Sequence, residues 1–236
     1  MKIYHSLSEF TPLSHAVVTS GTFDGVHVGH QKIIHRLNEL AATQGGESVV
    51  LTFWPHPRLV VSKTPDSPVQ LLTTIDEKAE ILADLGVHHL LVLPFTRDFS
   101  ELSAESYVQE SLLQGIGTKT RIIGYDHRFG KNRSGGFDFL QTNKHRFGVE
   151  VEEISRQEID NSAISSTKIR EALHKGNVEI ANELLGRSYS FKGVVVKGRQ
   201  LGRTIGFPTA NIYVSENYKL IPQNGVYAVR VHCRNK

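Results

Sequence analysis

The feature that most constrains the fold is a regular alternation of two patterns over the first 154 residues. Short apolar runs rich in β-branched residues predict buried strands at 15–19, 48–54, 88–93, 121–124 and 149–154. Segments with helical periodicity lie between them, at 31–42, 75–85, 104–113 and 137–147. This alternation predicts an α/β fold with a parallel sheet covered by helices on both faces, in which ligands bind at the carboxyl ends of the strands.

The pattern changes in the last quarter of the chain. Two short helices are expected at 167–173 and 178–184, separated by Lys175 and Gly176. After them come short strand-like runs with Gly and Pro between them, at 189–197, 210–214 and 226–232. We therefore expect two domains, an α/β domain at 1–185 and a β-barrel domain at 186–236. Three strands alone would leave open sheet edges and little core, so the second domain is expected to be incomplete.

Composition excludes several classes of protein. No apolar run approaches the roughly 20 residues that cross a bilayer, and the N-terminus lacks the apolar core of a secretory signal, which predicts a cytoplasmic protein without membrane contact. The single cysteine, Cys233, has no partner for an internal disulfide. The net charge is +3, but Lys and Arg are scattered. That distribution favours small phosphate-bearing substrates over nucleic acid.

The most informative motif is GTFDGVHVGH at 21–30, which follows the first of these predicted strands and precedes a helix. Glycines allow close approach of the backbone to a phosphate, and a helix N-terminus attracts anions. The imidazoles of His27 and His30 can donate hydrogen bonds to phosphate oxygens whose charge grows during transfer. An isolated His-x-x-His is commonly a solvated turn. Here the strand before it and the helix after it favour a phosphate site.

Three further segments carry residue types suited to ligand binding. The sequence ISSTKIR at 164–170 places hydroxyls and a cation at a helix start, although on its own it reads as an ordinary N-cap. The runs TFWPHP at 52–57 and GYDHRFG at 124–130 follow predicted strands, and their aromatic rings suit either a flat heterocycle or the core. Glycines at four-residue spacing precede GFPTAN at 206–211, whose oxygen-bearing side chains suit Mg²⁺.

With these motifs the chain resembles the HxGH nucleotidyltransferases and, more narrowly, the bifunctional riboflavin kinase and FMN adenylyltransferase proteins of bacteria, over nearly its whole length. The resemblance implies a Rossmann-like nucleotidyltransferase domain followed by part of a riboflavin kinase barrel. It implies His27, His30 and Arg170 as catalytic residues. The ATP-binding positions that it implies are Gly21, Phe23, Asp24, Gly25, His27, Gly29, His30, Ser165, Ser166, Thr167 and Arg170.

The same resemblance assigns a flavin site and a kinase site. The flavin positions that it implies are Phe53, Pro55, His56, Pro57, Asp126, Arg128 and Phe129. In the kinase part it implies Gly198, Gly202, Gly206, Thr209 and Asn211 around ATP phosphates, with Mg²⁺ held by Thr209 and Asn211. The family's kinase uses a Glu further along than Lys236 as general base, so riboflavin phosphorylation is expected of a longer parent and is not expected of these 236 residues.

The implied reaction transfers AMP from ATP to FMN, with Mg²⁺ as cofactor, and yields FAD and pyrophosphate. Alternatives remain open at this point. The first motif alone fits transfer to another small phosphate, such as phosphopantetheine or nicotinamide mononucleotide, although the kinase motif favours a flavin. A flavin-binding or regulatory protein without turnover is a second alternative, which intact His27, His30 and Arg170 disfavour. A nucleic-acid binder is the weakest, since no basic stripe is present.

Overall fold

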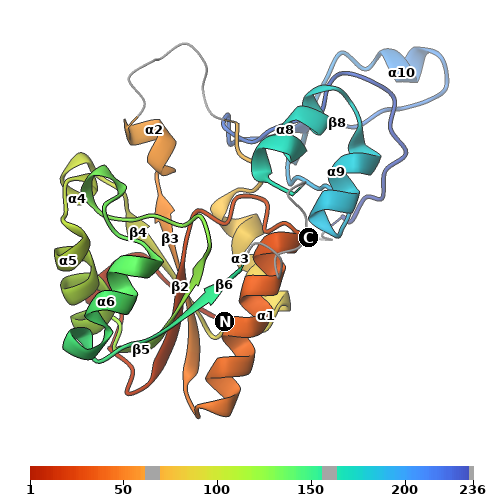
Figure 1. The fold of residues 1–236 in the computed structure, drawn as a ribbon. Helices are drawn as coiled ribbons and strands as arrows, with labels where there is room; N and C mark the ends of the chain where they lie inside the picture. Colours follow the sequence, from red (N-terminus) through yellow and green to blue (C-terminus); the bar gives the residue numbers. More distant parts are fainter. Residues whose placement is uncertain (62–69, 156–163, 234–236) are drawn as a thin grey trace.

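The computed structural model describes residues 1–61, 70–155 and 164–233 and contains a six-stranded, fully parallel sheet (Figure 1). The strand order is β1-β4-β3-β2-β5-β6. The strands are β1 (Lys2–Tyr4), β2 (Ala16–Ser20), β3 (Glu47–Trp54), β4 (His89–Pro94), β5 (Thr118–Gly124) and β6 (Glu150–Ile154). The expected α/β fold is confirmed, and all five predicted strands of this part are present. The edge strand β1 was not predicted, because three half-exposed residues carry no periodicity.

Helices cover both faces of the sheet, so the apolar residues form two cores (Figure 1). On one face lie α1 (Val28–Thr43) and α3 (Ile75–Asp84), packed on residues such as Val17, Val50 and Ile122. The other face carries α5 (Ala104–Ser106), the π-helix η2 (Tyr107–Gln114) and α6 (Phe137–Phe147). Three short elements were not predicted: α2 (Pro57–Val61), α4 (Arg97–Ser100) and the 3-10 turn η1 (Leu7–Glu9).

The sheet has its topological switch point at β2, whose two neighbours β3 and β5 continue the chain in opposite directions. The chain after β2 and the chain after β5 therefore leave this point towards opposite faces of the sheet, at the carboxyl ends of the strands, where α/β proteins bind ligands. The first motif follows β2 and the loop 124–130 follows β5. The fold thus brings two of the predicted site segments to the same end of the sheet.

Two helices follow the region 156–163, which lies outside the described residues. They are α8 (Ser166–His174) and α9 (Val178–Leu185), and they match the predictions within a residue or two. Ile169, Leu173 and Leu185 form a third apolar cluster with Leu72 and Leu220. This cluster joins α8 and α9 both to the loop before α3 and to a segment close to the end of the chain.

The barrel predicted for 186–236 is not confirmed. Strands β7 (Val194–Val196) and β8 (Asn211–Tyr213) form a small antiparallel pair, and the short helix α10 (Leu201–Thr204) lies between them in sequence. One further element, the 3-10 turn η3 (Lys131–Arg133), belongs to the α/β domain and lies between β5 and α6 in sequence. The strand predicted at 226–232 was wrong, because that run pairs with no neighbour in the part of the chain that the structure describes. A strand needs hydrogen bonds to an adjacent strand, and Val226, Val229 and Val231 are instead exposed.

None of the helices in the described ranges combines the length and the apolar character that a membrane crossing needs.

Candidate nucleotide site

The loop from β2 to α1 is a tight turn built from unusual backbone angles. Phe23, Gly25 and Val26 have φ of 45°, 81° and 40°. A Cβ on Gly25 would lie 2.7 Å from Cδ1 of Leu72, so this position excludes any side chain on steric grounds as well. Strain held by its surroundings at a strand end is typical of functional loops. The loop delivers His27 to the N-cap of α1 and His30 to its first turn.

The carboxylate of Asp24 is the junction between this loop and the second predicted motif. Its Oδ1 accepts hydrogen bonds from the backbone N–H groups of Leu72 (2.9 Å) and Thr73 (3.2 Å). Its Oδ2 forms an ion pair with Arg170 of α8 at 2.8 Å. Burial raises the pKa of Asp24, while the positive charges of Lys78 and Arg170 oppose that rise. The side chain therefore holds Arg170 in place from beneath the glycine-rich loop.

The N-terminus of α8 reaches the same loop through its hydroxyls. Ser165 is the N-cap and accepts from the backbone N–H of Lys168 at 3.3 Å, as predicted for an ordinary cap. Ser166 Oγ donates to the carbonyl of Asp24 at 2.9 Å, and Arg170 donates to Thr167 Oγ1 at 3.4 Å. The two motifs implied to bind ATP are thus in direct contact.

The two imidazoles are stacked, with ring centroids 3.6 Å apart and an interplanar angle of 15°. His27 Nδ1 accepts from the backbone N–H of His30 at 3.3 Å. Burial lowers the pKa of His27 to about 4, so the ring is neutral at pH 7 and carries its proton on Nε2. Burial, then His27 and Lys78, also lower the pKa of His30 well below its usual value. His27 Nε2–H is therefore a preformed neutral donor.

Two more titratable groups line this end of the sheet. Lys78 is buried on α3 and donates to the carbonyl of Thr22 at 2.7 Å and to Thr52 Oγ1 at 3.4 Å. Burial lowers its pKa to about 8, against the opposing effect of Asp24. His56, after β3, is buried too, and burial followed by Lys78, Arg58 and Arg170 lowers its pKa to about 4.

The predicted flavin residues divide between surface and core. Pro55, Asp126 and Arg128 are exposed, and Pro57 begins α2. Phe53 packs on Phe95 and Phe99, each at 5.6 Å between ring centroids. Asp126 and Arg128 are thus exposed, whereas Phe53 is partly buried against the core.

Phe129 is only 8% exposed and packs against Tyr107 at 5.2 Å. The antiparallel bridge from Phe129 to Gly135 folds the 124–130 loop back on itself, and a Cβ on Gly135 would collide with the Phe129 ring. The structure therefore places Phe129 in the core as a support of the loop.

A buried polar cluster lies beneath this loop at the switch point. Ser20 Oγ accepts from Arg121 and from Tyr107 Oη (3.2 Å) and lies 3.4 Å from His127 Nε2. Burial, then Arg121, lower the pKa of His127 to about 3, so its ring is neutral and can accept from Ser20. Arg121 is fully buried, and its Nε and NH1 have no hydrogen-bond partner among the described residues.

The predicted kinase loop folds compactly around β7 and β8. A Cβ on Gly198 would collide with the Asn211 carboxamide, and one on Gly202 would lie 3.2 Å from Thr209. Gly206 has φ of 82° and leads into Thr209 and Asn211, which are both exposed. Gly198 thus lies beside Asn211 and Gly202 beside Thr209, while the role of these residues in binding ATP and Mg²⁺ stays a prediction.

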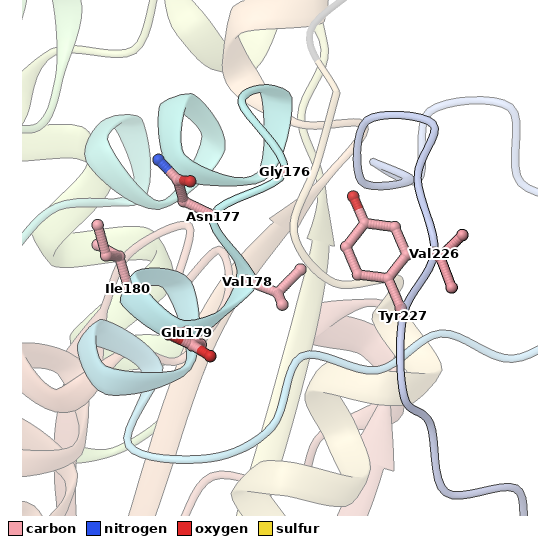
Figure 2. A pocket seen from close by; sticks show the side chains of 7 residues that line it. All are labelled: Gly176, Asn177, Val178, Glu179, Ile180, Val226 and Tyr227. Atoms are coloured by element: carbon pink, nitrogen blue, oxygen red, sulfur yellow. The ribbon is translucent and has the colours of Figure 1, made fainter.

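A separate cavity of about 350 Å³ lies between the α8–α9 turn, residues 176–180, and the pair Val226 and Tyr227. The side chains of Val178 and Tyr227 face each other across it (Figure 2). No residue of the predicted nucleotide or flavin motifs lines this cavity.

Sequence reasoning missed several residues that hold the site. Lys78 falls on the buried stripe of α3 with Ala79 and Leu82, and a lysine on an apolar helical stripe is a usable signal. Arg121 likewise interrupts a β-branched strand. Arg187 donates to the carbonyls of Gly25 (2.6 Å) and Val26 (3.2 Å), a long-range contact without a sequence signal.

A parallel sheet with a switch point, and a glycine-rich loop in contact with the N-terminus of a second helix, define the class of Rossmann-like nucleotide-binding α/β proteins. Comparison with known families narrows this class. The FAD synthetase family matches residues 10–168, and the riboflavin kinase family matches residues 185–236.

Similar proteins give the same result. A bifunctional riboflavin kinase/FMN adenylyltransferase of Listeria monocytogenes is 42% identical over 97% of this chain and 72% of its own length. The protein of the same name from Escherichia coli K12 is 37% identical over 96% of this chain and 71% of its own. A crystal structure titled macrolide-efflux protein from Streptococcus pneumoniae has a TM-score of 0.83 and 32% identity, covering 95% of this chain and 72% of that one. The chain belongs to the FAD synthetase family of bifunctional riboflavin kinase/FMN adenylyltransferases.

Proposed function

We propose that this protein makes FAD by transferring the adenylyl group of ATP to FMN. The observation that carries the proposal is the contact of the two phosphate-binding motifs, in which Asp24 of the glycine-rich loop pairs with Arg170 at 2.8 Å and its carbonyl accepts from Ser166. A triphosphate bridging the loop and the α8 N-terminus would meet backbone amides, hydroxyls and a fixed cation together. ATP is the substrate that this arrangement fits.

The reaction needs no covalent intermediate and no strong base. An ionised oxygen of the FMN phosphate attacks the α-phosphorus of ATP. The bond from that phosphorus to the bridging oxygen breaks, and pyrophosphate leaves with the electron pair. His27 Nε2–H donates to the phosphoryl oxygens as their charge grows, and Arg170 balances the triphosphate. Catalysis comes from orientation and charge stabilisation.

We assign the flavin to the carboxyl end of the sheet, beside the loops after β3 and β5. Phe53 supplies a ring, and Asp126 and Arg128 supply exposed polar groups. Two neutral imidazoles, His56 and His127, lie at the same end of the sheet and add no charge that would compete for the FMN phosphate.

We assign 1–185 to adenylyl transfer and 186–236 to the riboflavin kinase part. Thr209 and Asn211 offer the hard oxygen donors that Mg²⁺ prefers, and both stand exposed beside the glycine loop, so the residues present fit the ion. Mg²⁺ supplies charge neutralisation of ATP phosphates when bound. The matches cover 72% and 71% of the lengths of the two relatives, and riboflavin phosphorylation is assigned to the riboflavin kinase family that residues 185–236 match.

The proposal is tested by incubating the protein with ATP, Mg²⁺ and FMN and separating the flavins by chromatography. FAD is expected, and His30→Ala is expected to lose about a hundredfold in turnover at an unchanged circular dichroism spectrum. Absence of FAD with the parent protein would reject adenylyl transfer to FMN. A parallel tube with riboflavin reports on phosphorylation separately.

A further inference from the structure

A segment of the riboflavin kinase part inserts directly beside the nucleotide site. Leu71 N–H donates to the Tyr218 carbonyl at 2.7 Å, and Leu220 N–H donates to the Leu71 carbonyl at 2.8 Å, which forms a parallel bridge. Tyr218 also packs on Trp54 of β3 at 4.7 Å between ring centroids. Residues 218–220 therefore pair with the loop before α3 through an isolated parallel bridge.

Lys219 is the polar centre of this contact and is only 3% exposed. Its Nζ donates to the carbonyls of Leu72 (2.6 Å) and Ser190 (2.9 Å) and forms an ion pair with Glu77 Oε2 at 2.6 Å. Burial lowers the pKa of Lys219, and Glu77 opposes that effect. All three donor positions of the ammonium group are used, so the side chain is held in one geometry.

The residues that Lys219 holds are the ones that hold Asp24. Lys219 binds the Leu72 carbonyl, while the N–H groups of Leu72 and Thr73 bind Asp24 Oδ1. Glu77 Oε2 accepts from Thr74 N–H at 3.0 Å in the capping box of α3, which fixes the end of the same loop. The path from Lys219 to Arg170 thus runs through two backbone amides and one carboxylate.

We propose that Lys219 is a positioning residue of the adenylyl-transfer site, supplied by the riboflavin kinase part of the chain. It fixes residues 71–74, these residues fix Asp24, and Asp24 sets where Arg170 meets the triphosphate. The inference rests on the proposed function in that it takes the site of Arg170 to bind ATP. It makes the nucleotide site dependent on a residue more than a hundred positions away in the other functional part.

If Lys219 only stabilised the fold, its loss would lower the unfolding temperature and leave ATP binding by the folded protein unchanged. A variant in which the buried charge is compensated distinguishes this role from the positioning role. Lys219→Met alone leaves the Glu77 carboxylate buried without its cation, which destabilises the fold. Adding Glu77→Gln removes that charge and keeps one side-chain oxygen for the capping box, at the loss of the bond that the other oxygen accepts from the Lys192 N–H at 3.2 Å. The double variant thus restores electrical neutrality without restoring the contact to the Leu72 carbonyl.

The experiment compares parent, Lys219→Met with Glu77→Gln, and Lys192→Met. Lys192 is the matched control, because it lies on the same part of the chain and pairs with Glu80 of α3 where both side chains are half exposed. We would measure thermal unfolding, the KM for ATP and kcat in FAD formation, and binding of α,β-methylene-ATP by calorimetry. Arg170→Met identifies which binding heat belongs to this site.

The double variant is expected to unfold near the parent temperature and to show a KM for ATP, and a Kd for the analogue, about tenfold higher, with kcat changed less than about threefold. Lys192→Met should match the parent. Parent-like KM and Kd in the double variant would overturn the inference. If the parent forms no FAD, the proposed function fails, yet the calorimetric comparison still decides the positioning role.

Discussion

At the scale of single residues, His27 combines two tasks that are usually separate. Its Nδ1 caps α1 by accepting from the His30 N–H, and this bond leaves the proton on Nε2, where a phosphate would meet it. His27 thus caps the start of α1 through Nδ1 and presents a hydrogen-bond donor through Nε2.

His27→Asn tests this division. An Asn side chain is a strong N-cap, so α1 should remain stable, but the Nε2–H donor is lost. We expect kcat for FAD formation to fall about a hundredfold, with the unfolding temperature nearly unchanged. Steady-state kinetics and thermal melts measure the two effects. His35→Ala, on the exposed face of the same helix, is the control and should alter neither. A kcat within threefold of the parent would remove His27 from the donor role.

Arg121 is a charge held in the core, and no ion pair joins it to an acidic side chain within the ranges that the structure describes. It donates to Ser20, and its Nε and NH1 remain unpartnered among the described residues. Burial lowers its pKa, which reflects the cost of keeping a guanidinium there. A residue kept at such a cost under the proposed flavin loop is a candidate for function.

Arg121→Met is expected to raise the free energy of unfolding by about 1 kcal/mol, because an apolar side chain of similar length replaces an uncompensated buried charge. Urea denaturation measures the change. Arg36→Met, which removes a partly exposed ion pair to Glu152, serves as the control and should lower stability by less than about 1 kcal/mol. A loss of 2 kcal/mol or more in Arg121→Met would contradict the expectation.

Sequence reasoning singled out residues whose signal is local. His27 and His30 stand in a motif between a strand end and a helix start, Arg170 was implied by the family resemblance, and the structure brings the two segments into contact. It did not find Lys219, since that residue matters through a pairing with Leu72 far away in the chain. Whether Phe129 stacks on flavin also depended on tertiary packing, and the ring lies in the core.

At the scale of elements, the turn from β2 into α1 depends on Gly25 for two independent reasons. Its φ of 81° disfavours any other residue, and a Cβ would meet Leu72 Cδ1 at 2.7 Å. Gly45, after α1, has φ of 63° but no atom within 4 Å of a Cβ. Comparing Gly25 with Gly45 therefore distinguishes the cost of the positive φ from the cost of the collision with Leu72.

Gly45→Ala is therefore expected to lower the free energy of unfolding by about 1 kcal/mol, from the strained φ alone. Gly25→Ala should lower it by about 2–4 kcal/mol, because repacking against Leu72 adds to the same strain. It should also reduce FAD formation, since the displaced loop carries His27. Chemical denaturation of both variants gives the comparison, and equal losses would show that Leu72 moves aside at no cost.

Elements were predictable where periodicity and burial agree. Helix α6 was expected at its observed bounds, and β2 to β6 were expected within a few residues. The failure at 226–232 has a physical reason, because a run rich in valine shows β-propensity but not the presence of a partner strand. The short α2 and α4 span five and four residues and are too brief to carry a periodic signal.

At the scale of the whole molecule, the placement of the site followed from topology. Alternating strands and helices predicted a parallel sheet, and the order β1-β4-β3-β2-β5-β6 puts the switch point next to β2, where the first motif begins. The docking of 216–223 onto the α/β domain was not predictable, because it combines backbone pairing, one buried ion pair and the packing of Tyr218 and Leu220, and these long-range contacts leave no pattern in sequence. This segment therefore contacts the α/β domain beside the candidate nucleotide site.

Stability should fall in mild acid because several histidines are buried as neutral rings. Burial lowers the pKa of His27 and His56 to about 4 and that of His127 to about 3, against 6.5 for the unfolded side chain. Between these values the unfolded chain binds more protons than the folded one, so unfolding becomes easier as pH decreases. Stability from these groups is complete above pH 6.5 and is lost progressively towards pH 4.

We expect the free energy of unfolding, measured by urea denaturation, to drop steeply between pH 7 and pH 5. His127→Gln should reduce that drop by about 1–2 kcal/mol, because one titrating group is removed while a hydrogen-bonding side chain remains near Ser20. His35→Gln, on the exposed surface of α1, is the matched control and should reproduce the parent profile. An identical pH dependence in His127→Gln and the parent would show that His127 is not held neutral in the folded protein.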